Sequence, residues 1–272
     1  MCEQTEQTQK KAVVSGGCLA LVGGIAGQLA QAGYRVAVIG LADEAQAAAE
    51  LGGAYWYRQA DLAQPLTPEQ AVKDAAEALG GVDLLVCTAG VFPAGGLLNT
   101  TLEEMDNAHN LNYRSFLLQA KAAANLMIEA QKPGSIVFVT SNHGLRAYKD
   151  DFLYGSLQAA LHRACESLAM QLAPYRVRIN CVAHGELEGV TPVPQEEPDF
   201  AFRLPLQRRE TMQELGDAIL YLGEKAGYST GTVLKTDGGL TLAGMPEAPY
   251  GYGWDKDRDL GSEEDPPWRK KD

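Results

Sequence analysis

The chain lacks the features that mark a membrane protein or a disulfide-bonded secreted protein. No stretch approaches the roughly 18 consecutive apolar residues of a membrane-spanning helix. Residues 1–11 are polar and contain no apolar core of a signal peptide. The cysteines show neither a Cys-x-x-Cys pair nor a histidine at ligand spacing, so we expect reduced thiols, no metal site and a cytoplasmic protein. These cysteines are Cys2, Cys18, Cys87, Cys165 and Cys181.

Positive charge is also scarce. Lysine and arginine together number 23 against 35 aspartates and glutamates, which leaves a formal net charge of −12. Nucleic acids and anionic membrane surfaces are bound through basic patches. The charge balance therefore predicts neither partner, and a small-molecule substrate is expected instead.

The sequence does contain a regular alternation of short apolar runs and helical patterns. Of its 272 residues, 46% are hydrophobic, which is enough for a substantial core. Strands separated by helices form parallel sheets that are covered on both faces. We predict an α/β fold, a single doubly wound Rossmann-type sheet over residues 1–242. Residues 243–272, which are acidic and rich in proline, are predicted to form an irregular C-terminal extension.

The expected boundaries follow from the apolar periodicity. Helix 102–131 is expected to break near Asn112. Strands are predicted at 12–14, 35–39, 54–59, 82–87, 135–140, 177–182 and 233–236, and helices at 19–31, 43–51, 67–79, 102–131, 152–172 and 210–222.

Two hydroxyl side chains stand out as candidates for proton chemistry. Ser141 ends the apolar run at 135–140, and Tyr154 follows thirteen residues later, with Gln158 four residues further on. Other motifs precede them in a fixed order. Ser15, Gly16 and Gly17 follow the first strand, Asp61 and Leu62 follow the third, and Thr88, Ala89 and Gly90 follow the fourth.

This ordered series resembles the short-chain dehydrogenase/reductase family. The resemblance implies that Tyr154 exchanges a proton with a carbonyl or alcohol oxygen, that Ser141 holds this oxygen, and that Asn112 supports a proton relay. It also implies an NAD or NADP cofactor and a homodimer or homotetramer. The implied cofactor-binding residues are Ser15, Gly16, Gly17, Ala20, Val22, Asp61, Leu62, Ala89, Gly90 and Gln158.

The chain departs from the family pattern at three places in the cofactor site. Gln158 stands where the family has a lysine, and loss of a cation at ~4–6 Å raises a tyrosine pKa by about 1–3 units. Ala20 and Val22 replace glycines of the phosphate-binding turn, where we expect Val22 to fit only if the helix shifts outward. The second strand ends at Gly40 without an acidic or basic residue, and Asp43 is expected to cap the next helix.

Three functions therefore stay open. The first is a divergent oxidoreductase acting on a small carbonyl or alcohol substrate, with Tyr154 as proton donor. The second is a cofactor-independent enzyme that uses Ser141 and Tyr154 for elimination, hydration or ring opening, as halohydrin dehalogenases do, although those carry arginine where this chain has Gln158. The third is a non-catalytic subunit.

Two histidines are candidates for the substrate pocket. His143 lies two residues after Ser141, and His184 replaces the proline that the family has beside the nicotinamide. Arg146 or Lys149 could substitute for the missing lysine. Residues 186–209 resemble the family's loop over the substrate, whereas His109 and His162 lie in helical patterns and are expected to be structural.

Overall fold

The computed structural model describes residues 9–93, 96–148, 151–190 and 204–242. Seven parallel strands form one sheet in the order β3-β2-β1-β4-β5-β6-β7, which confirms the predicted doubly wound architecture. The expected extension at 243–272 and part of the expected substrate loop lie outside the described residues. The strands are β1 (Lys11–Ser15), β2 (Arg35–Gly40), β3 (Trp56–Gln59), β4 (Leu84–Cys87), β5 (Gly134–Ser141), β6 (Val177–His184) and β7 (Val233–Thr236).

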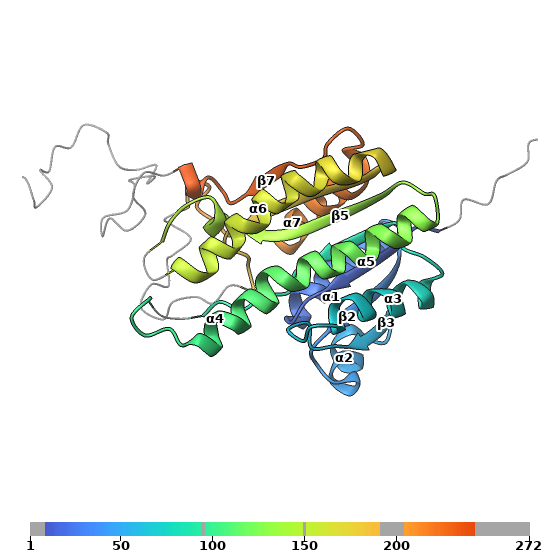
Figure 1. Cartoon of the computed structure of the whole chain (residues 1–272), viewed down its shortest axis with the longest axis horizontal. Helices are drawn as coiled ribbons and strands as arrows, with labels where there is room; N and C mark the ends of the chain where they lie inside the picture. The colour runs from blue at the N-terminus through green and yellow to red at the C-terminus, as the bar shows by residue number, and fades with distance from the viewer. Residues whose placement is uncertain (1–8, 94–95, 149–150, 191–203, 243–272) are drawn as a thin grey trace, which may run out of the picture.

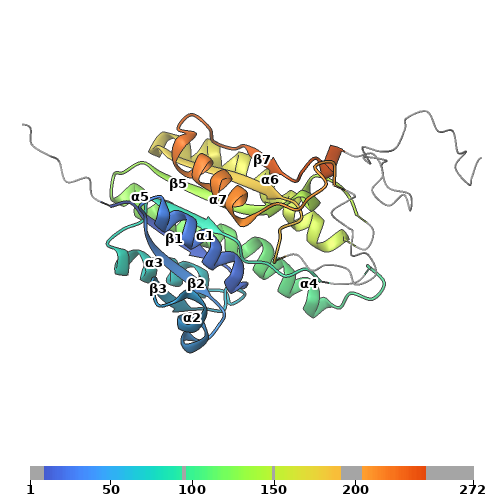
Figure 2. The ribbon, with the colours of Figure 1, turned by 180° about the vertical axis from the view of Figure 1, so that it is seen from behind.

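Helices cover both faces of this sheet. On the face turned to the viewer in Figure 1, α3, α5 and α6 pack over a core that includes Phe116, Phe138 and Leu161. Figure 2 shows α1 and α7 on the opposite face, above a second core that includes Ile25 and Ile219. The helices are α1 (Leu19–Gln31), α2 (Glu44–Leu51), α3 (Thr67–Leu79), α4 (Leu102–His109), α5 (Ser115–Glu129), α6 (Phe152–Leu172) and α7 (Met212–Leu220).

Local sequence signals explain several helix ends. Thr101 caps α4 and Thr211 caps α7, each in a capping box with the glutamate three residues later. Asp43 accepts from the backbone N–H of Gln46 at 2.8 Å, so its expected role as the cap of α2 is confirmed. Near Asn112, where a break was predicted, a π-helical turn at Asn110–Arg114 interrupts the α-helical hydrogen-bond pattern, but the backbone stays helical from α4 to α5.

The sheet brings the candidate residues to one edge. β1 leads to β2 on one side of the sheet, whereas β4, its other neighbour, leads to β5 on the other side. In such sheets ligands bind beyond the carboxyl ends of the strands, at the point where the order reverses. The turn after β1, the segment after β4 and the end of β5 all reach this edge, so the fold places the site there.

Two absences concern the described residues only. None of their helices combines the length and the hydropathy needed to cross a membrane. Their histidine, cysteine, aspartate and glutamate side chains include no group of three or more in an arrangement that could hold a metal ion.

Candidate active site

The hydroxyls of Ser141 and Tyr154 meet at the junction of β5 and α6. Ser141 is the last residue of β5, is buried, and stands opposite His184 of β6. Its Oγ accepts from the backbone N–H of His143 at 3.2 Å. Tyr154 lies in the first turn of α6, where the side chain of Ser141 influences the pKa of its hydroxyl. The predicted pair is thus brought together.

The environment of Tyr154 favours its protonated form. Burial raises the pKa of Tyr154 to about 12, although the neighbouring Ser141 side chain acts to lower it; the negative charge of Asp151 raises it further. A phenol with this pKa keeps its proton at neutral pH and is suited to donate it to an oxygen that gains negative charge. The arrangement therefore supports proton donation better than proton abstraction.

Gln158 is buried and points at the end of β5. Its Oε1 accepts from the backbone N–H of Ser141 at 3.2 Å. The Gln158 side chain therefore helps to hold Ser141 in place. This role was not predicted from its position, at which the family has a lysine. Of the two cations considered as substitutes, Arg146 donates to the carbonyl of Leu240 at 3.2 Å and lies over the ring of Tyr148, whereas Lys149 is outside the described residues.

Asn112 is fully buried in the π-helical turn between α4 and α5. Its amide donates to the carbonyl of Val91 and its carbonyl oxygen accepts from the N–H of Val91, both at 2.8 Å. Gly90 passes so close that a Cβ there would lie 2.7 Å from Asn112 Oδ1. Asn112 therefore fixes the segment that follows β4 and carries Ala89 and Gly90.

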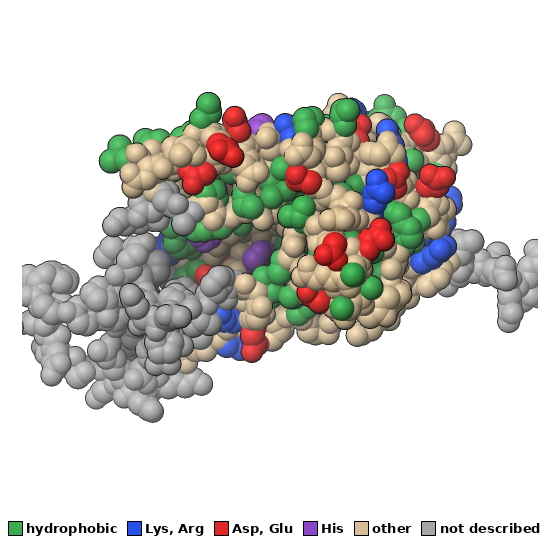
Figure 3. Space-filling model, turned by 90° about the horizontal axis from the view of Figure 1, so that it is seen from below, with side chains coloured by type: hydrophobic (Ala, Val, Ile, Leu, Met, Phe, Trp, Pro, Cys, Tyr) green, Lys and Arg blue, Asp and Glu red, His purple; other side chains and the backbone are tan. Residues whose placement is uncertain are grey.

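His143 lies beside Tyr154 and is paired with an aspartate. Its Nδ1 is 2.7 Å from Oδ2 of Asp151, the residue that caps α6. The His143 ring stacks on Tyr148, with centroids 4.3 Å apart, and meets Tyr154 edge-to-face at 5.5 Å. Phe92 closes the group, with its ring 5.1 Å from Tyr154. Figure 3 shows histidine side chains in a hollow of one face of the molecule.

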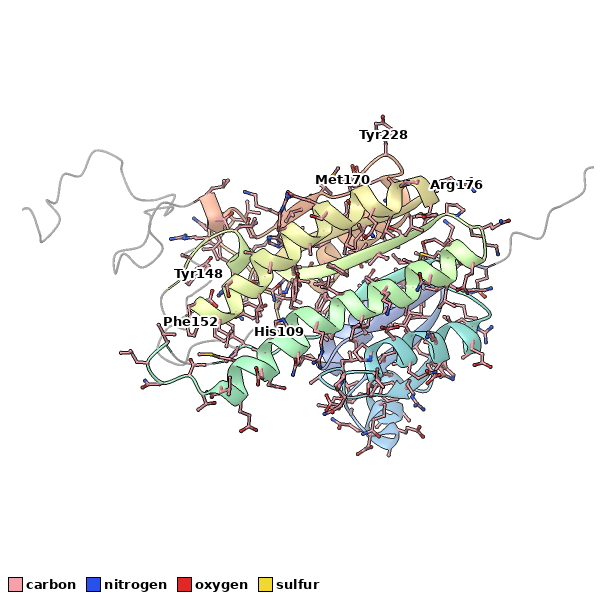
Figure 4. The ribbon with its side chains drawn as sticks, viewed as in Figure 1. His109, Tyr148, Phe152, Met170, Arg176 and Tyr228 are labelled. Carbon is pink, nitrogen blue, oxygen red and sulfur yellow. The ribbon has the colours of Figure 1, made fainter. Side chains whose placement is uncertain are left out.

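This site occupies one end of the molecule. In Figure 4, Tyr148 and Phe152 lie by the first turn of α6, whereas Arg176 and Tyr228 lie toward its other end. His184 also belongs to the site end: its Nδ1 is 2.8 Å from the carbonyl oxygen of Gly185, and burial lowers the pKa of its imidazole.

The turn after β1 is closely packed on its inner side and open on its outer side. A Cβ at Gly16 would collide with Thr88 Oγ1 and would lie 2.7 Å from Val22 Cγ1. Val22 is fully buried, so its isopropyl group fills the space under the turn and does not project toward a ligand. Gly17 and Ala20 are exposed on the outer side, and a Cβ at Gly17 would meet no atom within 4 Å.

Other polar groups lie at the same edge of the sheet, at and after the ends of β2 and β3. The hydroxyl of Tyr57 donates to the carbonyl of Ala42 at 2.8 Å and would lie 2.9 Å from a Cβ on Gly40. Asp61 is exposed, and its carboxylate accepts from the N–H of Ala63 and from the amide of Gln64, each at 2.9 Å. Leu62 is buried in the core, so its side chain does not face this edge.

Comparisons with known proteins agree with this geometry. A family profile described as Enoyl-(Acyl carrier protein) reductase matches residues 21–241. The human 3-oxoacyl-(acyl-carrier-protein) reductase is 32% identical over 235 residues, which cover 86% of this chain and 98% of the human protein. The chain belongs to the short-chain dehydrogenase/reductase family.

Other members show the same relation. The 3-alpha-(or 20-beta)-hydroxysteroid dehydrogenase of Mycobacterium tuberculosis is 30% identical over 245 residues, covering 89% of this chain and 93% of that protein. A short-chain dehydrogenase/reductase structure from Serratia marcescens superposes with a TM-score of 0.77 at 27% identity, covering 85% of this chain and 98% of that one. The chain thus has the NAD(P)-binding Rossmann fold of an oxidoreductase family.

The residues present fit the diphosphate part of a dinucleotide. Helix α1 begins at Leu19, and the first N–H bonded within it is that of Val22, which donates to Cys18 O at 3.0 Å. The earlier N–H groups of a helix lack intrahelical acceptors and attract phosphate oxygens. The Val22 side chain packs inward beside Gly16, and the expected outward displacement of α1 stays a prediction. Ser15, Gly16 and Gly17 lead directly into this helix start.

Three residues of the site were missed from sequence. Asp151, Tyr148 and Phe92 come from the segment before α6 and the segment after β4, and their meeting with His143 depends on how these two segments pack. One signal was available for Asp151: an aspartate just before a helical pattern is a typical N-cap. Nothing in the spacing indicated the partner of its second oxygen.

Proposed function

We propose that this chain is a dinucleotide-dependent reductase of a small carbonyl compound. Tyr154 donates its proton to the carbonyl oxygen, and Ser141 holds that oxygen by a hydrogen bond. A reduced nicotinamide, when bound, supplies the hydride. The observation that carries this proposal is the buried Tyr154 hydroxyl, with a pKa of about 12, beside Ser141 at the carboxyl edge of the sheet.

The neighbours of the pair have supporting roles. Gln158 fixes the backbone of Ser141 through its N–H, and the N–H of His143 donates to Ser141 Oγ, so this hydroxyl keeps one orientation. Asn112 holds Val91 and with it the segment that contains Ala89 and Gly90. Preorganised donors of this kind lower the barrier because they need not reorient as charge develops.

The raised Tyr154 pKa also supports a direction. An acid with a pKa of about 12 is almost wholly protonated at neutral pH and is ready to donate. Alcohol oxidation needs the phenolate, which is scarce under these conditions. Reduction is therefore the favoured reaction at neutral pH. The substrate test begins with 3-oxoacyl thioesters and ketosteroids, since these are the chemical classes in the names of the two relatives.

Cofactor use is tested by binding. Calorimetry and thermal unfolding with NADH and with NADPH should show heat and a raised Tm, since a ligand at about 100-fold its Kd stabilises the folded state by roughly 2.7 kcal/mol. The end of β2 carries no acid or base at Gly40 and Leu41, so the two dinucleotides are tested side by side. If millimolar NADH and NADPH both gave no heat and no shift in Tm, the proposal would be refuted.

A second candidate is a cofactor-independent reaction on the same Ser141–Tyr154 pair. It is supported by Gln158, which carries no charge and is bonded to Ser141, and by the uncharged end of β2. An epoxide or halohydrin converted without any dinucleotide, and lost in Tyr154→Phe, would favour this candidate. Turnover that requires NADH or NADPH would exclude it.

The proposal includes a homodimer or a homotetramer in the cytoplasm. The family resemblance supports a contact through the helices of residues 102–131 and 152–172. Light scattering should then give about two or four times the chain mass of 29.2 kDa. A mass of one chain at micromolar concentration would contradict it.

A further inference from the structure

The pair formed by His143 and Asp151 is built as an ionisable unit. The Asp151 side chain is only 2% exposed and the His143 side chain 21%. Asp151 uses Oδ1 to accept from the N–H of Gly155 at 3.1 Å and presents Oδ2 to His143 Nδ1 at 2.7 Å. A carboxylate at Nδ1 fixes the ring and stabilises a proton on the other nitrogen.

The backbone nearby leaves room for this pair. A Cβ at Gly155 would lie 2.8 Å from Asp151 Oδ2 and 3.0 Å from the carbonyl oxygen of His143. Any larger residue at this helical position would therefore displace the carboxylate. A cavity of about 580 Å³ is lined by His143, Tyr148 and Asp151, among others, and gives the pair contact with water.

Aromatic rings enclose His143. Tyr148 stacks on its ring, and the rings of Tyr154 and Phe92 meet it edge-to-face, with centroids 5.5 Å and 5.6 Å away. Aromatic faces stabilise a nearby cation by about 0.5–2 kcal/mol. Among the described residues, the charges of Glu186 and His184 also interact with that of His143, and Arg146 lies over the ring of Tyr148.

We propose that the His143–Asp151 pair is the charge partner of Tyr154. Protonated His143 supplies, beside the Tyr154 ring, the positive charge that Gln158 does not carry, and so stabilises the phenolate left when the Tyr154 proton departs. The idea rests on the proposed role of Tyr154 as proton donor. His143 and Asp151 act through Tyr154, so they are positioning residues.

Electrostatics gives the pair two states. With His143 neutral, the uncompensated charge of Asp151 acts on Tyr154 and opposes loss of its proton. With His143 protonated, the imidazolium, paired with that carboxylate and 5.5 Å from the Tyr154 ring between centroids, opposes the effect of the negative charge. The proton that Tyr154 gives up is recovered from water, and no bond to His143 forms or breaks. Reduction should therefore become faster as His143 gains its proton.

The first test needs neither substrate nor cofactor. Tyrosine labelled with 13C at Cζ is followed by NMR from about pH 5 to about pH 9, the range in which histidine titrates. The Tyr154 resonance is identified by its loss in Tyr154→Phe. We expect it to shift with pH in the wild type and in His109→Gln, and to lose this step in His143→Gln. His109 is the matched control because it is exposed on α4 and makes only a ring contact with Tyr113 (Figure 4).

A second variant removes the charge and keeps the helix cap. Asparagine caps helices as well as aspartate does, so Asp151→Asn should fold. The pKa of Tyr154 should then fall, because the negative charge of Asp151 no longer raises it. A step that persists unchanged in His143→Gln would assign the titration to Glu186 or His184 and overturn the proposal. So would a Tyr154 resonance that does not shift in the wild type.

The activity arm separates this proposal from the proposed function. In the reducing direction, the kcat of the wild type should fall with rising pH through the same step as the Tyr154 resonance. The kcat of His143→Gln should not change with pH in this range and should be at least about 10-fold lower than that of the wild type at low pH, as expected for a lost charge. KM should stay unchanged, and His109→Gln should match the wild type. If the wild type binds no dinucleotide and reduces no carbonyl, the proposed function fails, and the NMR arm still decides whether His143 controls Tyr154.

Discussion

Placing a lysine at position 158 tests the electrostatic account of Tyr154 most sharply. Gln158 lies one helical turn after Tyr154 on α6, and its Oε1 accepts from the N–H of Ser141 at 3.2 Å. A cation at ~5 Å interacts with a phenolate by about 3 kcal/mol at an effective dielectric constant of 20, which corresponds to a pKa change of roughly 2 units. In Gln158→Lys the Tyr154 pKa should fall from about 12 to about 9–11.

The consequence for rate extends to both directions. At about pH 8 the phenolate fraction should rise about 10- to 1000-fold, which follows from a pKa decrease of about 1–3 units. Oxidation of the alcohol product should accelerate because more phenolate is present, and reduction should accelerate as well, because the added cation stabilises the phenolate that forms when Tyr154 gives up its proton. Loss of the acceptor for the Ser141 N–H should destabilise the fold by about 1–3 kcal/mol.

The assay is the initial rate of alcohol oxidation between about pH 6 and about pH 10, with folding checked by thermal unfolding. Gln171→Lys is the matched control, since Gln171 is exposed on the same helix and the variant adds the same charge far from Tyr154. An oxidation profile of Gln158→Lys that coincides with those of the wild type and of Gln171→Lys would refute the reasoning.

Two further predictions concern the packing that holds the site. Asn112→Ala leaves the N–H and carbonyl of Val91 without their partner, so the free energy of unfolding measured by urea denaturation should fall by about 2–4 kcal/mol. The control Asn107→Ala, on the exposed side of α4, should stay within about 0.5 kcal/mol of the wild type. Equal effects of the two substitutions would contradict the role of Asn112. Gly16→Ala should lower the free energy of unfolding by about 1–3 kcal/mol, because its methyl group meets Thr88 and Val22, whereas the methyl group of Gly17→Ala has open space. If thermal unfolding found Gly17→Ala to be the less stable variant, the turn would not be packed as described.

Much of the fold could be predicted from the sequence because local signals and tertiary packing agree. The bounds of α1, α3, α6 and β7 match the expected ranges 19–31, 67–79, 152–172 and 233–236. For α3, Gly80 ends the helix in the left-handed conformation at φ 74°, a conformation typical of glycine after a helix.

Other boundaries depended on contacts that periodicity does not show. Helix α7 begins after Thr211 and not at Glu210, because Thr211 and Glu214 form the capping box while the backbone of Glu210 pairs with Glu186 and Glu188. Likewise, Val82 precedes β4 since the strand begins to pair with β1 only at Leu84. These differences come from long-range hydrogen bonds between segments that are distant in the sequence.

The candidate site divides in the same way. The order of motifs was sufficient to place Ser141, Tyr154 and Gln158 together, because the strand-to-helix connection sets their distances. The inward packing of Val22 was not predictable, since the direction of its side chain depends on the face of α1 that meets β1. The contact of Asp151 with His143 was missed because both residues precede α6 in a segment without periodicity.

The central claim is that Tyr154 delivers the proton during a dinucleotide-dependent reduction. The most direct measurement is turnover of Tyr154→Phe beside its binding of NADH and NADPH, with Tyr228→Phe as control because Tyr228 is fully exposed at the far end of the molecule (Figure 4). Phenylalanine keeps the ring and removes only the hydroxyl. We predict unchanged dinucleotide affinity and a loss of turnover of about 100-fold or more, in line with the loss of a general acid. Turnover equal to that of the wild type would contradict the account.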